Sequence, residues 1–524
     1  MECALVLVGA GPCALAVLGR LAYAADGRCG TSPAEAARAR ELLRSTLVVS
    51  SAGWMGGWQA KLASQGVAWL RSPTFVNPHP ARPIDDALLA FATARRAPLR
   101  RIRGVRHAWV AVAPPLLDDF CEGLLLELER RLPASTLPSR QQLTAAAVYH
   151  ATVLQIRPRE GRFELILADG CPPLTAARVV VATADGGVRA LPEWFADAQR
   201  SARVPHSLLH STDLAALHAA CGKPPPLAPR RAAVSRAAGW HLATRAARLL
   251  RRGLACVEDA LAGRPWVSRV LAAMPSALAA PDAMAARGEG RLVVVGGGLS
   301  AAQLAIRALK LGWRHVLLVS RGALVVRPFD LHACWLERHW QPALLADEEE
   351  FFRSAYERRR ALLHAARPGG SVTPCCWEEL GRLARRGGLR VEEHTCVTRA
   401  EWREGATERS PLQGRSAGYA CWHLKLTHAA GRETSARADT IWLATGNRLD
   451  VTAQPLLRSV RECSSAREHG GLPELTPSLR WEDGMKLYIA GALSALQIGP
   501  DALTLGGAGL CAARIVSDIL QEEP

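Results

Sequence analysis

The sequence predicts an α/β protein of two domains with parallel sheets, the second domain inserted in the first. One pattern, a strand followed by a glycine turn and a helix, occurs at residues 6–22 and again at 291–310. Short apolar strands lie between the two copies and after the second. The length of 524 residues also exceeds what one hydrophobic core usually supports, so two or more domains are expected.

The first copy reads VLVGAGPCALAVLGRLA and the second RLVVVGGGLSAAQLAIRALK. A glycine turn of this kind is weak evidence alone, but each copy directly follows a β-branched strand and directly opens a helix. Glycines let backbone N–H groups approach a phosphate, and the helix N-terminus favours the anion. The pattern therefore predicts two Rossmann-like dinucleotide-binding domains, with turn residues Gly9, Gly11, Pro12 and Ala14 in the first and Gly296, Gly298, Ser300 and Ala301 in the second.

The remaining chain predicts further strands and one long insertion. Residues 151–156 and 162–168 alternate and predict a hairpin, while 177–183, 439–446 and 486–492 predict short buried strands before a last helix at about 502–521. The segment 222–290 breaks this pattern with a proline-rich linker and a basic helix. It is interpreted as a docked insertion and a contact surface for a partner or a second copy, while 347–360 predicts a surface helix.

Composition excludes several classes of function. The net charge is +17, yet the arginines are scattered and no zinc-finger, RRM or KH pattern occurs, so nucleic-acid binding is not expected. No transmembrane segment and no secretory signal are predicted. The 14 cysteines include no C-x-x-C pair, which favours reduced thiols and a cytoplasmic location. No metal-ligand spacing and no hydrolase elbow are present.

Several stretches together resemble the two-dinucleotide-domain flavoproteins. These are GAGPCALAVL, the stretch GWMGGWQAKLASQGVAWLRSPTFVNPHP (53–80), RVPHSLLHSTDL (203–214), LLVSRGALVVRPFD (317–330) and ALSALQIGPDALTLGGAG (492–509). The chain looks most like the flavin-dependent monooxygenases, including the siderophore N-hydroxylases, and the related oxidative-stress-induced growth inhibitor-like proteins. The resemblance covers most of the chain except about 222–288.

The resemblance implies FAD at the first turn and NADPH at the second. The strand at 46–49 ends in Ser50 and Ser51, where this group usually has an acid that pairs with ribose. Arg321, beside Ser320, would meet the 2′-phosphate of NADPH, because a guanidinium suits that dianion. NADH stays open as the alternative, in which Arg321 is only a solvent-exposed arginine. The other residues expected at the cofactors are Trp58, Arg71, Val153, Thr445, Gly446, Gly491, Asp501 and Leu503.

Two residues are candidates for a catalytic role. Asn77 is expected near the flavin, where its amide would donate a hydrogen bond, although an asparagine before Pro78 also suits a turn. His210 is expected between the domains near the nicotinamide. The resemblance further implies a domain order of 1–215 for the first part of the FAD domain, 216–288 for the insertion, 289–435 for the NAD(P)H domain and 436–524 for the rest of the FAD domain.

The function implied is a monooxygenase that oxygenates a nucleophilic nitrogen or sulfur of a small molecule with O₂, through a flavin C4a-(hydro)peroxide. Two alternatives stay open. One is an NAD(P)H oxidase or reductase that oxygenates nothing. The other is a regulatory scaffold that keeps the fold without the chemistry, which the missing ribose acid and the basic insertion would suit.

Overall fold

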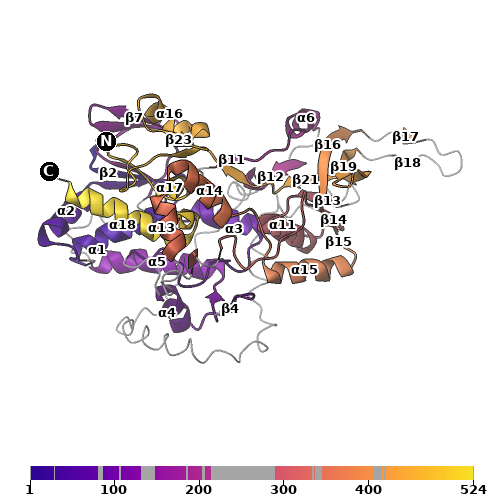
Figure 1. Ribbon diagram of the computed structural model, residues 1–524, viewed down its shortest axis with the longest axis horizontal. Helices are drawn as coiled ribbons and strands as arrows, with labels where there is room; N and C mark the ends of the chain where they lie inside the picture. The colour runs from indigo at the N-terminus through magenta and orange to yellow at the C-terminus, as the bar shows by residue number, and fades with distance from the viewer. Residues whose placement is uncertain are drawn as a thin grey trace.

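The structure is a computed structural model that describes residues 2–28, 30–80, 86–105, 108–131, 148–183, 187–202, 207–213, 290–332, 335–336, 345–404, 407–408, 416–417 and 420–522. Two parallel sheets dominate these residues and lie in separate halves of the molecule (Figure 1). The predicted basic insertion at 216–288, its proline-rich linker and its helix fall outside the described residues. None of the described helices is long and apolar enough to cross a membrane.

The first domain is built on a five-stranded parallel sheet in the order β25-β10-β2-β3-β6. Its central strands are fully buried, which explains their unbroken runs of Val, Leu and Ile. Helices α1 (Pro12–Ala25) and α18 (Leu505–Gln521) pack against each other beside it. The strands are β2 (Leu5–Val8), β3 (Thr46–Val49), β6 (Val148–Tyr149), β10 (Val179–Val181) and β25 (Leu487–Ile489).

Smaller elements complete this domain. The predicted hairpin is confirmed as β7 (Val153–Arg159) and β8 (Arg162–Leu167), which join β9 (Leu174–Ala176) and β1 (Glu2–Cys3) in a second sheet. Helix α2 (Pro33–Arg44) begins with a capping box between Ser32 and Glu35. Helices α3 (Gly56–Gln65), α4 (Ala87–Ala94) and α5 (Pro114–Arg131) follow.

The second domain has its own parallel sheet, in the order β12-β21-β13-β14-β15. Helices α11 (Leu299–Lys310) and α15 (Pro374–Arg385) pack against each other, and α6 (Phe195–Ser201) packs on an antiparallel sheet of β16 (Thr395–Arg403), β19 (Cys421–His428) and β20 (Glu433–Ala438). The parallel strands are β12 (Leu208–His210), β13 (Arg291–Val295), β14 (His315–Val319), β15 (Leu389–Glu392) and β21 (Thr440–Leu443).

This pairing corrects the predicted domain boundaries. Strand β12 was assigned to the first part of the FAD domain and β21 to its second part, yet both pair within the second sheet. The chain crosses between the domains on the antiparallel ribbon of β11 (Gly187–Arg189) and β22 (Asn447–Leu449), which Figure 1 shows between the two sheets. The inserted domain therefore begins before residue 208 and ends after 443.

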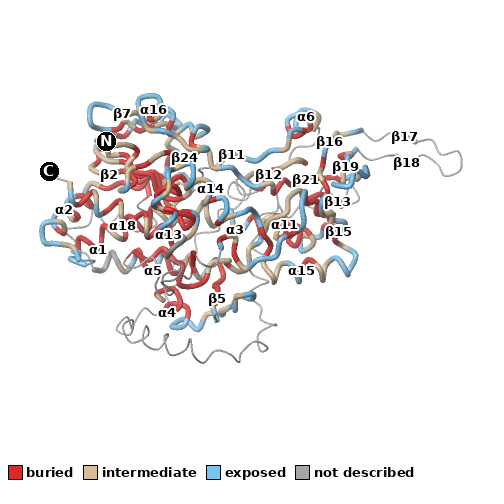
Figure 2. The backbone as a smooth tube through the Cα atoms, viewed as in Figure 1, coloured by how far each residue is buried: buried red, intermediate tan, exposed pale blue. Residues whose placement is uncertain are grey.

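A segment inside the second domain returns to the first. After β14 the chain packs Phe329, Leu331 and Phe351 into the core of the first domain, together with helices α13 (Leu345–Arg353) and α14 (Tyr356–Ala366). The prediction of one surface helix over 347–360 is wrong, because two helices form and Phe351 is fully buried. Figure 2 shows buried segments beside α14 and α13 at the centre of the first domain.

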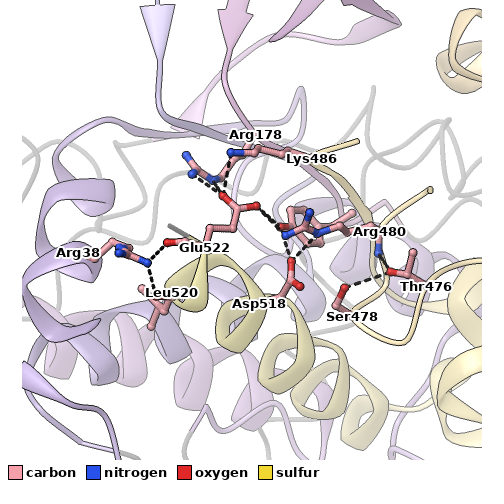
Figure 3. Close-up of polar contacts among 10 residues, drawn as sticks. Arg38, Arg178, Thr476, Ser478, Arg480, Lys486, Asp518, Leu520 and Glu522 are labelled. Carbon is pink, nitrogen blue, oxygen red and sulfur yellow. Dashed lines mark hydrogen bonds and ion pairs between the residues drawn. The ribbon is translucent and has the colours of Figure 1, made fainter. Parts of the chain in front are cut away.

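The last residues of α18 are fixed by charge. The buried Glu522 carboxylate meets Arg178 at 2.5 Å, Arg480 at 2.8 Å and Lys486 at 3.1 Å (Figure 3). Arg480 also pairs with Asp518 at 2.6 Å. Arg178 and Lys486 immediately precede β10 and β25. The cluster therefore lies at the amino ends of these parallel strands, at the opposite end of the sheet from the glycine turn.

Candidate functional site

The first glycine turn has the shape that a close phosphate contact requires. Gly9 has a φ of 102°, and a Cβ there would lie 2.8 Å from the carbonyl oxygen of Ala182, so only glycine fits without strain. A Cβ at Gly11 would meet nothing within 4 Å. No side chain caps the N-terminus of α1 at Gly11. The N–H groups of its first turn are therefore not capped by the residue at Gly11, and such groups suit an anion.

The residues expected at the ribose and the flavin lie on several elements of the first domain. Ser50 ends the strand next to β2, and its Oγ accepts a bond from the N–H of Ala52 at 3.4 Å, while Ser51 is exposed. Trp58 lies on α3, and Val153 begins β7. Sequence reasoning missed Trp54, whose Nε1 is buried with no partner among the described residues. Its neighbour Met55 donates to the carbonyl of Ala10, which places Trp54 beside the turn.

The closing segment lies against the same turn. A Cβ at Gly491, just after β25, would lie 3.3 Å from Sγ of Cys13 in the first turn of α1. Asp501 is buried, whereas the large apolar side chain of Leu503 is 42% exposed. Both belong to the 3₁₀ turn Pro500–Leu503 that leads into α18. The structure therefore brings Gly491 next to the first turn of α1, which begins after Gly11.

The second glycine turn repeats this geometry with tighter neighbours. Gly296 has a φ of 148°, and a Cβ there would overlap the carbonyl of Ala444, while a Cβ at Gly297 would overlap Oγ of Ser320. Helix α11 begins after Gly298 with no side-chain cap. Ser320 is buried at the end of β14, and the next residue, Arg321, is exposed.

Helix α11, which starts at this turn, docks on the first domain. Ser300 Oγ lies 3.2 Å from Oε1 of Gln65 at the end of α3. Arg307 donates to the carbonyl of Ala63 on the same helix, and burial lowers the pKa of its guanidinium to about 10. Gly66 fits against the Arg307 side chain. The two glycine turns are thus held in a fixed relation by the α3–α11 contact.

The strand order of the second sheet reverses between β13 and β21. In such sheets ligands bind beyond the carboxyl ends of the strands at this point. His210 ends β12 and is fully buried, and Thr445 follows β21. The His210 Nε2 and Thr445 Oγ1 atoms are both buried with no hydrogen-bond partner among the described residues. Gly446, also predicted here, follows directly and is exposed.

The protonation of His210 follows from its surroundings. Burial lowers its pKa, and the nearby charge of Arg189 lowers it further, so the ring is neutral at physiological pH. Its Nδ1 accepts a bond from the backbone N–H of Thr212 at 3.3 Å, which leaves the proton on Nε2. The charge of Asp213 and the Gly446 backbone both oppose this lowering of the pKa. Nε2 therefore carries the ring proton of the neutral imidazole.

Two residues differ from their predicted roles. Asn77 was expected to donate to the flavin, but its amide donates to the carbonyls of Thr74 and Phe75, and its Oδ1 accepts the N–H of His79. It holds a buried turn. Arg71 was expected to line the flavin or substrate, but its side chain bonds to Asp330 and to four further acceptors of the protein.

Asp118 on α5 is a titratable group that sequence reasoning missed. Burial raises its pKa to about 7, although a hydrogen bond with Gln59 of α3 opposes the rise. Its Oδ1 has no partner among the described residues. No motif marks this position, because the signal is burial of a lone carboxyl on a helix.

Because its pKa is raised, Asp118 is expected to lower the free energy of unfolding as the pH rises. The unfolded carboxyl ionises near its ordinary value of 3.8 and the folded one near 7, so the free energy of unfolding falls between these values. Asp118→Asn should raise the melting temperature by about 2 °C at pH 8 and leave it unchanged at pH 3.5. The control is Asp119→Asn, whose carboxylate is exposed and paired with Arg95. Equal pH profiles for Asp118→Asn and the wild type would refute the assignment.

Comparison with known structures identifies the fold. No family description and no curated protein matches the sequence. Similar structures include the reduced ornithine hydroxylase of Pseudomonas aeruginosa, 17% identical over 99% of both chains with a TM-score of 0.59. The ornithine N-hydroxylase of Kutzneria sp. 744, with reduced FAD, NADP⁺ and L-ornithine, is 15% identical over 99% of both chains with a TM-score of 0.57.

The chain has the fold of these hydroxylases. The L-lysine 6-monooxygenase of Pseudomonas syringae is also similar, at 15% identity and a TM-score of 0.56, over 99% of this chain and 100% of that one. The predicted α/β class with two Rossmann-like domains, one inserted in the other, is thereby confirmed.

Proposed function

We propose that this chain is an FAD- and NADPH-dependent oxidoreductase that oxygenates a nucleophilic nitrogen or sulfur of a small molecule, with O₂ as co-substrate. The observation that carries the proposal is the pair of uncapped helix N-termini at Gly11 and Gly298, each preceded by a glycine that no other residue can replace without overlap. The fold shared with the hydroxylases supports it. A cytoplasmic location is part of the proposal, and all cysteines in the described residues are free.

The two cofactors fit different turns. FAD would place its pyrophosphate at Gly9–Ala14 and its ring against Trp58 and the closing segment 491–503. NADPH would lie across Gly296–Ala301, with its 2′-phosphate beside Ser320 and Arg321. When bound, FAD would accept a hydride from NADPH and activate O₂.

The chain's own polar groups would then orient the nicotinamide. Because the neutral His210 holds its proton on Nε2, it would donate to a carboxamide oxygen. The Thr445 hydroxyl would supply a second contact from the neighbouring strand. A buried donor without a partner is costly, so a ligand that satisfies both atoms gains that energy.

Absorbance of the purified protein tests the proposal. Protein reconstituted with FAD is expected to show a flavin band that NADPH bleaches without oxygen. Admission of air should then give a transient absorbance distinct from both the oxidised and the reduced flavin before the band returns.

Two other results of this absorbance experiment would each contradict part of the proposal. Reoxidation with no transient, with peroxide released in proportion to NADPH, would indicate an oxidase or reductase. Absence of a flavin band after addition of FAD would indicate a scaffold. A transient absorbance before the flavin band returns is therefore the result that distinguishes a monooxygenase.

Arg321 is expected to make the protein prefer NADPH to NADH. Removing a charged hydrogen-bonding partner of the 2′-phosphate by Arg321→Ala should raise KM for NADPH about tenfold and leave KM for NADH unchanged. Steady-state kinetics with both cofactors measure this. Arg399→Ala is the control, because that arginine is 70% exposed on β16 of the same domain. An equal rise for both cofactors would contradict a 2′-phosphate contact.

A further inference from the structure

Arg71 connects the first domain to the segment that leaves and re-enters the second. It lies between α3 and α4, next to Leu70, whose backbone N–H bonds to Val112 within the first domain. Its guanidinium reaches the outgoing stretch Arg327–Asp330 and the returning Ser371. These two stretches are also joined to each other, because Val372 donates to the carbonyl of Val325 at 2.8 Å.

The protein itself uses every donor of this guanidinium. An arginine has five N–H donors in a planar fork. Nε donates to the carbonyl of Pro328 at 2.8 Å. Nη1 contacts Asp330 at 2.6 Å and the Ser371 carbonyl at 3.4 Å. Nη2 donates to the Arg327 carbonyl at 2.9 Å and to Ser371 Oγ at 2.7 Å.

Ser371 is held from the other side as well. Its backbone N–H donates to Oδ1 of Asp330 at 3.1 Å, and its hydroxyl donates to the same oxygen at 2.9 Å. The residue is fully buried. Arg71, Asp330 and Ser371 therefore form one closed set of contacts that leaves the Ser371 backbone a single position.

The residue before Ser371 contacts the second glycine turn. The position of a Cβ on Gly298 lies 3.4 Å from Cα of Gly370, and a Cβ on Gly370 would lie 3.0 Å from Cα of Gly298. Backbone meets backbone here with no side chain between. Any shift of Ser371 is thus passed to the wall of the turn where α11 begins.

We propose that Arg71 is a positioning residue that sets the affinity of the second turn for NADPH, acting from the first domain through Ser371 and Gly370. This inference rests on the proposed function, because it takes a nicotinamide dinucleotide as the ligand of that turn. Arg71 touches neither cofactor in this scheme. Loss of the Arg71 side chain lets Gly370, which walls the second turn, move. The FAD turn at Gly9–Ala14 in the first domain stays intact.

The test compares Arg71→Ala and Arg71→Lys with a matched control. The control is Arg103→Ala, because Arg103 joins the same two domains through an exposed ion pair with Glu378. The FAD content, the melting temperature without nucleotide and the dissociation constant of NADP⁺ are measured for each FAD-reconstituted protein. Lysine concentrates its donors at one point and cannot reproduce the fork.

The expected result is a rise of about tenfold in the dissociation constant of NADP⁺ for both Arg71 variants, with FAD content equal to wild type and less than a twofold change for Arg103→Ala. Wild-type affinity in the Arg71 variants, or a parallel loss of FAD, overturns the inference. If Arg71→Ala does not fold, Arg71→Lys and Ser371→Ala decide by the same criteria. Absence of NADP⁺ binding by the wild type instead refutes the proposed function.

Discussion

Gly11→Val is expected to leave the fold intact and to abolish retention of FAD. Gly11 has a φ of −94°, which a β-branched residue adopts readily, and apart from its chain neighbours a Cβ there would meet no atom of the described residues within 4 Å. The valine side chain would instead occupy the space in front of the first turn of α1, where a pyrophosphate has to approach the N–H groups. The ratio of FAD to protein and the melting temperature of the cofactor-free protein measure the two effects separately.

Two companion variants sharpen this experiment. Gly9→Ala should lower both FAD retention and stability, because its Cβ would lie 2.8 Å from the Ala182 carbonyl and its φ of 102° disfavours alanine. Gly57→Ala should change neither, since nothing lies within 4 Å of a Cβ there. Retention of FAD by Gly11→Val at the wild-type ratio would mean that this turn only joins a strand to a helix.

Glu522→Ala is expected to lower the free energy of unfolding of the first domain by about 3 kcal/mol. The variant leaves Arg178, Arg480 and Lys486 around an emptied, buried position (Figure 3). Denaturant unfolding followed by circular dichroism measures the loss. Glu164→Ala is the control, because its ion pair with Arg159 lies on the outer hairpin and Arg159 is 63% exposed.

The pH dependence of the same cluster has a defined sign. Burial alone would raise the pKa of Glu522, but its bonds to Arg178 and Lys486 together lower it from the ordinary value of 4.5. A lowered folded pKa adds stability above 4.5 that is lost as pH falls through the folded value. Wild type and Glu522→Ala should therefore converge in stability in strong acid. A difference that persists unchanged there would contradict an ionic origin.

The elements that sequence predicted well are those with local signals. Buried parallel strands need unbroken apolar runs, and a strand-to-helix turn that packs against a neighbouring strand needs glycine. The sequence therefore predicts β2, β13 and the turns that follow them. The hairpin of β7 and β8 is legible because one face is buried and residues alternate. The sequence predicted one surface helix in place of α13 and α14. The many charged residues of this stretch indicate a solvated face, and nothing local indicates that Phe351 packs into the first domain.

The candidate site divides in the same way. The glycine turns and several strand ends could be read from the sequence, but the partners of Arg71 could not, because Asp330 and Ser371 lie far along the chain. The buried state of Trp54 and Asp118 has no local signature either. Their environments depend on which helices pack together.

By itself, then, the sequence determined the class of the fold, the two glycine turns that open helices and the strand end before Thr445, because each depends on neighbours within a few residues. Only the tertiary structure decided where the second domain begins and ends, that Arg71 and Asn77 bind protein groups rather than a ligand, and that His210 Nε2 and Thr445 Oγ1 are buried. The physical reason is that hydrogen bonds and burial are settled between segments hundreds of residues apart, whereas backbone conformation and hydrophobic period are settled locally.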